Sequence, residues 1–107
     1  MTIEYIVNLK KLNWESPVEG VRFKKSLFNE KSIRIVEYTD NFIEPDWCTK
    51  GHIGFVISGE FEIDFNVVII KYKKGDVITI ASGEKHKHKA NIKSKRVKVF
   101  LVEDNSL

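Results

Sequence analysis

The only cysteine of the chain and all three of its histidines fall between positions 48 and 88. Cys48 and His52 are four residues apart, and a single lysine separates His86 from His88. Thiolate sulfur and imidazole nitrogen suit zinc, iron, nickel or copper better than magnesium or calcium. A site needs three or four such atoms converging on one ion at about 2.0–2.3 Å, with an open position if catalysis is intended. The candidate ligands of a divalent transition metal are therefore Cys48, His52, His86 and His88.

These side chains also have a simpler interpretation in which no metal is bound. His52 and His86 can be hydrogen-bonded residues of a cavity, and His88 a partly exposed strand residue. Cys48 can be a small buried thiol, which is a common state of a free cysteine. Imidazole titrates near neutral pH, so metal-free histidines could still act as general acids or bases. Spacing alone defines no catalytic pair of nucleophile and base.

Trp47 and Cys48 lie in the least regular segment of the middle of the chain, residues 39–50. Pro45 cannot donate to a strand ladder, so this segment is predicted to be a loop or an edge strand. Loops on a rigid scaffold often carry binding residues, which makes Trp47 a candidate ligand contact. The alternative is that Trp47 and Cys48 only close one end of the fold.

The segments that must position these residues alternate apolar and polar side chains with a period of two. That period is typical of half-buried strands. Such segments recur every eight to twelve residues or so, with turns between them, as in antiparallel sandwiches and barrels. No helix is predicted. The expected strands cover 21–28, 32–38, 52–58, 60–65, 68–72, 77–81, 85–90 and 96–102, with His86 and His88 on the same face of one strand.

The size and charge of the chain limit the classes of function. A chain of 107 residues is expected to be one domain, here an arm (1–19), a barrel (20–103) and a tail (104–107). The net charge of +3 comes with lysines that alternate with apolar residues, and no nucleic-acid-binding motif accompanies them. One cysteine allows no intramolecular disulfide. We find neither a signal-peptide pattern nor an apolar run near ~20 residues, so we expect a cytoplasmic protein without membrane partners.

The spacing of glycines and histidines resembles the cupin superfamily, whose members are small jelly-roll barrels of the RmlC-like type. The first motif of that family ends in a glutamate, six residues and a glycine, and these positions hold His52 and Gly59. The second motif is a glycine, five residues, Pro-x-Gly, two residues and a histidine. Here it corresponds to Gly75, Ala81-Ser82-Gly83 and His86. The resemblance implies an all-β, double-stranded β-helix fold over residues 20–103.

The first motif departs from the family pattern more than the second. The family's His-x-His pair falls on Asp46 and Cys48, or with a longer spacing on Pro45 and Trp47. The segment from Trp47 to His52 nevertheless resembles small stand-alone cupins that carry Trp-Cys-x-x-Gly-His. Family histidines point into the barrel and hold a divalent transition metal.

The resemblance therefore implies a small stand-alone cupin that binds a small molecule and a divalent transition metal in its cavity. If the protein is an enzyme, the resemblance implies metal-dependent oxygenase- or isomerase-type chemistry on a small polar substrate. The alternatives are a metal-free ligand-binding or sensing module, and a structural homodimer with an empty barrel. A homodimer is expected because the open edge strands of a small barrel need covering.

Overall fold

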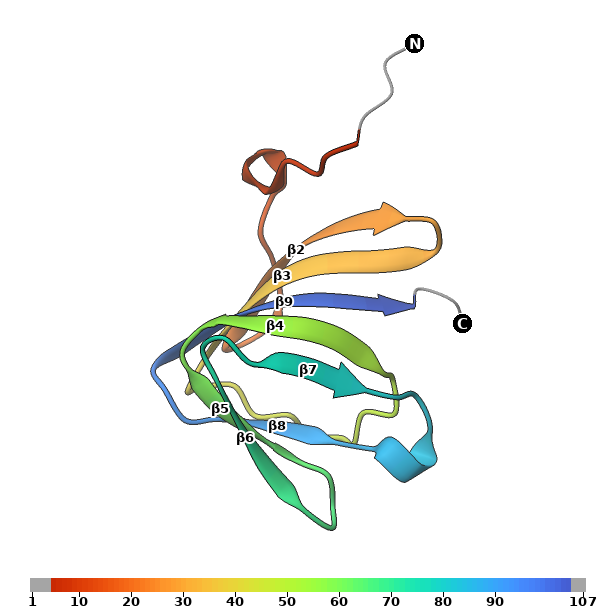
Figure 1. Ribbon diagram of the computed structural model, residues 1–107. Coiled ribbons are helices and arrows are strands. Elements are labelled where there is room, and N and C mark those ends of the chain that lie inside the picture. The colour runs from red at the N-terminus through yellow and green to blue at the C-terminus, as the bar shows by residue number, and fades with distance from the viewer. Residues whose placement is uncertain (1–4, 105–107) are drawn as a thin grey trace.

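The computed structural model describes residues 5–104, and that part of the chain is all-β, as predicted (Figure 1). The first four residues of the predicted arm (1–4) and the last three of the predicted tail (105–107) lie outside the described residues. Two short 3-10 helices are present, η1 (Leu9–Lys11) and η2 (Glu84–His86). The strands are β1 (Glu15–Val18), β2 (Val21–Phe28), β3 (Lys31–Thr39), β4 (His52–Ser58), β5 (Glu60–Asp64), β6 (Ile69–Lys73), β7 (Val77–Ile80), β8 (Lys89–Ile92) and β9 (Arg96–Asp104).

The strands form two antiparallel sheets that face each other (Figure 1). The larger sheet has the order β1-β2-β3-β9-β4-β7, and the smaller has the order β6-β5-β8. The chain crosses from the larger to the smaller sheet at Gly59, between β4 and β5. Gly59 has a φ of +85°, and a Cβ there would collide with the carbonyl oxygen of Arg96. Only glycine adopts this backbone conformation without strain, so the crossing depends on it.

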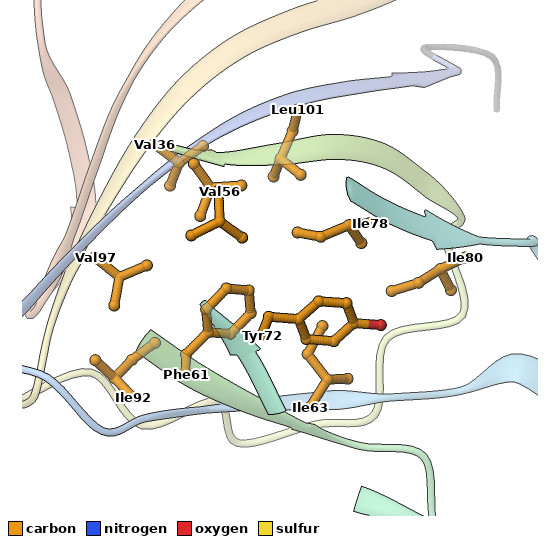
Figure 2. Packing of buried hydrophobic residues seen from close by; sticks show 11 residues of the cluster. Val36, Val56, Phe61, Ile63, Tyr72, Ile78, Ile80, Ile92, Val97 and Leu101 are labelled. Carbon is orange, nitrogen blue, oxygen red and sulfur yellow. The ribbon is translucent and has the colours of Figure 1, made fainter. Parts of the chain in front are cut away.

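The core fills the space between the two sheets, and Figure 2 shows side chains from both sheets meeting there. Alternate residues of β9 are buried, which is the pattern expected of a strand with one face on a core. Phe61 and Tyr72 from the smaller sheet stack with ring centroids 5.5 Å apart. The core cluster comprises Val36, Val56, Phe61, Ile63, Tyr72, Ile78, Ile80, Ile92, Val97, Val99 and Leu101.

The outer face of the larger sheet is apolar and exposed at β4 and β7. The predicted alternation along β4 is confirmed, because Gly54 and Val56 are buried whereas Ile53 and Phe55 are exposed. Val77 of β7 pairs with Phe55 and is also exposed. These side chains form a contiguous apolar surface on neighbouring strands.

The predicted strand over residues 85–90 is wrong. The chain forms η2 up to His86 and enters β8 only at Lys89. A 3-10 turn has three residues per turn, so the period of two that would place both histidines on one side is broken. His86 is consequently exposed, whereas His88 is buried. None of the helices in residues 5–104 has the length and apolar run that crossing a membrane would take.

Candidate functional site

Cys48, His52 and His88 form a compact cluster at one end of the space between the sheets. One potential ligand atom from each lies within 4.8 Å of the others. Cys48 Sγ is 4.0 Å from His52 Nε2. The ring centroids of His52 and His88 are 5.2 Å apart, and the two ring planes make an angle of 79°. Three nitrogen and sulfur donors at this separation could close on one ion with small side-chain movements.

Backbone pairing holds the three residues in place. Cys48 and His88 form an isolated antiparallel bridge, in which each N–H donates to the other's carbonyl oxygen at 2.9 Å. His52 is the first residue of β4, on the same inward phase as Gly54 and Val56. The preceding Gly51 allows the chain to pass close to β7, because a Cβ there would lie 2.5 Å from the carbonyl oxygen of Ile80.

A carboxylate from β9 orients His52. His52 Nδ1 lies 2.6 Å from Glu103 Oε2, and the other oxygen of Glu103 lies 2.9 Å from Arg34 Nη2. The three residues come from β4, β9 and β3, which are neighbours in the larger sheet. Because Nδ1 faces Glu103, Nε2 is the ring nitrogen that faces Cys48, and it can ligate a metal once it gives up its proton.

His88 is oriented in the same sense by its own backbone. Its Nδ1–H donates to the carbonyl oxygen of His86 at 3.0 Å, which places the lone pair on Nε2. This Nε2 is buried and has no hydrogen-bond partner among the described residues. Metal-bound imidazoles usually donate their second N–H to a carboxylate or a carbonyl in this way. The donor set and the unpartnered Nε2 therefore fit a divalent transition metal.

The electrostatics of the cluster favour a thiolate. The contact with His52, and then that with His88, lowers the pKa of Cys48 to about 6 against the opposing effect of burial. Burial acts to lower the pKa of His52, but the contacts with Cys48 and Glu103 outweigh it and raise that pKa to about 9. A cysteine ligates metal as the thiolate, so the arrangement prepares the sulfur for coordination.

A cavity of about 290 Å³ opens beside the cluster. Its walls come from both sheets and are mostly apolar. Its polar lining beyond the cluster consists of Arg34, Tyr38 and Glu44. Glu44 Oε1 accepts a hydrogen bond from the backbone N–H of Ala90 at 2.7 Å. The volume is at the lower end of the roughly 300–1,000 Å³ of ligand pockets, so the cavity suits a small molecule.

The structure does not bring the other two predicted site residues into this group. The exposed imidazole of His86 lies outside the cluster and outside the cavity lining, and only its backbone carbonyl contributes, through His88. Trp47 is not among the cavity-lining residues. Its ring is covered by the ammonium groups of Lys89 and Lys87, at 4.8 and 5.4 Å from the ring centroid. Trp47 therefore packs against the beginning of β8.

Two polar residues of the site were missed in the sequence. Glu103 follows Val97, Val99 and Leu101 on the inward phase of β9, and Arg34 stands on the inward phase of β3. The signal available in the sequence was a charged residue at an inward position of a strand whose other inward residues are mostly apolar. The spacing of the histidines and the cysteine carries no information about such a residue.

A family model for the cupin domain matches residues 46–103, which is more than half of the chain. The chain belongs to the cupin family, as the spacing of its glycines predicted. A search of curated proteins found no match.

Solved structures share the fold over nearly the whole chain. An RmlC-like cupin from Shewanella frigidimarina superposes with a TM-score of 0.74 at 14% identity, covering 97% of this chain and 93% of that one. KdgF from a Halomonas species gives 0.73 at 16% identity, over 96% of each chain. The polyketide cyclase RemF from Streptomyces resistomycificus gives 0.76 at 13% identity, covering 97% of this chain and 81% of its own. The predicted jelly-roll fold is confirmed, and at these identities the likeness concerns the fold alone.

Proposed function

We propose that this cupin binds one divalent transition metal through Cys48, His52 and His88 and holds a small molecule in the adjoining cavity. The observation that carries the proposal is the buried, unpartnered Nε2 of His88, which lies with the Cys48 thiol and His52 Nε2 in one cluster. Zinc, iron, nickel and copper all accept this donor set.

The chain's own residues have distinct tasks in this proposal. Glu103 fixes the tautomer of His52, and the carbonyl of His86 fixes that of His88. With only three protein ligands, a bound ion would keep a position for water or a substrate, as in catalytic sites. A bound ion would supply a Lewis acid to a molecule held there. Oxygenase- or isomerase-type chemistry stays a prediction, as do His86 as a ligand and Trp47 as a ligand contact.

Elemental analysis of the protein purified without a histidine tag tests the metal proposal. We expect close to stoichiometric metal in the wild type and its loss in His52→Ala and His88→Ala. His86→Ala is the matched control, because it removes a neighbouring imidazole that lies outside the cluster. If the wild type binds no metal, or if only His86→Ala loses it, the proposed centre is wrong.

A metal-free ligand-binding or sensing module is the second candidate function. The observation in its favour is that Cys48 Sγ and His52 Nε2 lie 4.0 Å apart, within reach of a direct thiol–imidazole hydrogen bond. The lining of the cavity also comes from residues of both sheets. Melting curves with and without added zinc, iron or nickel separate the two functions. Unchanged melting with a hit in a small-molecule screen would favour the module.

We also propose a homodimer that pairs through the apolar outer face of the larger sheet. Ile53, Phe55 and Val77 expose 63%, 44% and 61% of their surface there. Sedimentation analysis should give a dimer that Phe55→Asp dissociates. Val67→Asp is the control, because Val67 is an exposed apolar residue of the β5–β6 loop, off this face. A wild-type monomer refutes the proposal. Cytoplasmic localisation and the lack of nucleic-acid or membrane partners stay predictions.

A further inference from the structure

Arg34 gives the cavity a distinctive chemistry. Among residues 5–104, it is the only lysine or arginine that lines the cavity. It projects from β3 into a space otherwise walled mainly by aliphatic and aromatic side chains, and only 21% of its side chain is exposed. A guanidinium placed among apolar walls is a strong recognition group, because water screens it little.

Most of the hydrogen-bonding capacity of Arg34 is unused by the protein. Its Nη2 lies 2.9 Å from Glu103 Oε1, and its guanidinium carbon lies 5.4 Å from the centroid of the Phe23 ring. Its Nε is buried and has no hydrogen-bond partner among the described residues. A guanidinium has five N–H donors in a planar fork that matches a carboxylate. Donors therefore remain for an anionic group in the cavity.

The acidic residues of the site do not compete for this role. Glu103 already contacts both Arg34 and His52, and it is not among the residues that line the cavity. Glu44 accepts the backbone N–H of Ala90. The Tyr38 hydroxyl adds a neutral donor to the lining, because burial raises the pKa of Tyr38 to about 12. Arg34 and Tyr38 thus offer hydrogen-bond donors to a ligand, and Arg34 is the permanently charged one of the two.

We propose that the ligand of this cavity is a small carboxylate with an apolar body, and that Arg34 binds its carboxylate group. The apolar walls would cover the apolar body of the ligand. Because Arg34 contacts Glu103, which in turn contacts His52, the carboxylate group of the ligand would lie close to the Cys48–His52–His88 cluster. The inference rests on the cavity of the proposed function and names its ligand class. It does not require that the metal be present.

Calorimetric titration of the full chain tests the inference with two pairs of probes. The pairs are 3-phenylpropionate with 3-phenylpropanamide, and 4-methylpentanoate with 4-methylpentanamide. Each amide keeps the shape of its acid and removes the charge. We expect at least one carboxylate to bind about tenfold to a hundredfold more tightly than its amide, the range for one charge-assisted contact. If neither carboxylate binds more tightly than its amide, or if nothing binds, the inference is overturned.

Variants assign the preference to the residue. Arg34→Met should abolish the preference for carboxylate over amide, and Arg34→Lys should keep part of it. Arg22→Met is the matched control, because Arg22 pairs with Glu37 at 3.0 Å but lies outside the cavity lining. A second measurement needs no variant: the Nε–H resonance of Arg34 in the wild type should shift with the carboxylate and not with the amide. Retention of the preference in Arg34→Met, or an unmoved resonance, would overturn the inference.

Failure of the ligand inference can be told apart from failure of the metal proposal. The titrations are run on zinc-loaded wild type and on His88→Ala, and the zinc content of each is measured. Stoichiometric zinc without a carboxylate preference overturns only the ligand inference. A carboxylate preference that depends on Arg34, in wild-type protein that takes up no metal, supports the ligand inference and overturns the metal proposal.

Discussion

Replacing Glu103 with glutamine tests how much the orientation of His52 contributes to metal binding, because Glu103 contacts His52 but is not itself a proposed metal ligand. Glu103 makes two contacts with its two oxygens, one with His52 Nδ1 at 2.6 Å and one with Arg34 Nη2 at 2.9 Å. Burial acts to raise the pKa of Glu103, but His52 and Arg34 outweigh it and lower that pKa, so the group is a carboxylate at neutral pH. Glutamine keeps the shape and one acceptor oxygen while removing the charge.

The magnitude follows from what remains in Glu103→Gln. One contact can persist as a neutral hydrogen bond, and the other loses its acceptor. Loss of a charge-assisted contact at a buried group costs about 1.5–3 kcal/mol of unfolding free energy. Because a partner that orients a metal-bound imidazole is typically worth about tenfold to a hundredfold in metal affinity, we expect zinc to bind more weakly by that factor.

The assay is competitive zinc titration with a chromophoric chelator, together with urea unfolding of the same samples. Asp104→Asn is the control, since it makes the same chemical change one residue further on, in an exposed pair with Lys31. We expect no measurable change in zinc affinity from that variant. Equal zinc affinity in wild type and Glu103→Gln would refute the assigned orientation of His52.

Three further predictions concern the thiol, the core and the sheet crossing. In metal-free protein, the alkylation rate of Cys48 should rise with a midpoint near pH 6, since contacts with His52 and then His88 lower the pKa of its thiol to about 6; a midpoint near 8.5, the ordinary value, would contradict the pairing. Ile78→Val should cost about 0.5–1.5 kcal/mol in urea unfolding, while the exposed Ile43→Val should change nothing measurable. Gly59→Ala should destabilise more than Gly75→Ala in the same assay: both have positive φ, but only Gly59 also meets a backbone oxygen.

The sequence was sufficient to predict most of the individual strands because their signal is local. Alternation with a period of two places Val56 and Phe55 on opposite faces of β4 whatever the partner strands are. Two of the clustered residues, Cys48 and His52, were also identifiable by type and by their short separation. The choice between His86 and His88 was not, because one 3-10 turn decides which imidazole faces the cavity.

Glu103 and Arg34 escaped prediction for a different reason. They meet His52 only because β3, β9 and β4 are neighbours in one sheet, although they are far apart in the chain. Strand order and register are long-range properties, and periodicity within a segment does not contain them. The sequence indicated which residues share a face of each strand with Arg34 and with Glu103, but it did not indicate which residues lie next to them on the neighbouring strands.

Register also explains why the core and the candidate site are specified together. Pairing of Ile53 with Val102 sets the β4–β9 register, and one step along the strands His52 meets Glu103. The same register turns Val99 and Leu101 into the core. A slip of one residue would move all inward side chains of β9 to the outer face. The burial of apolar residues therefore opposes a one-residue slip, which would also separate Glu103 from His52, so the stability of the core helps to preserve the geometry of the site.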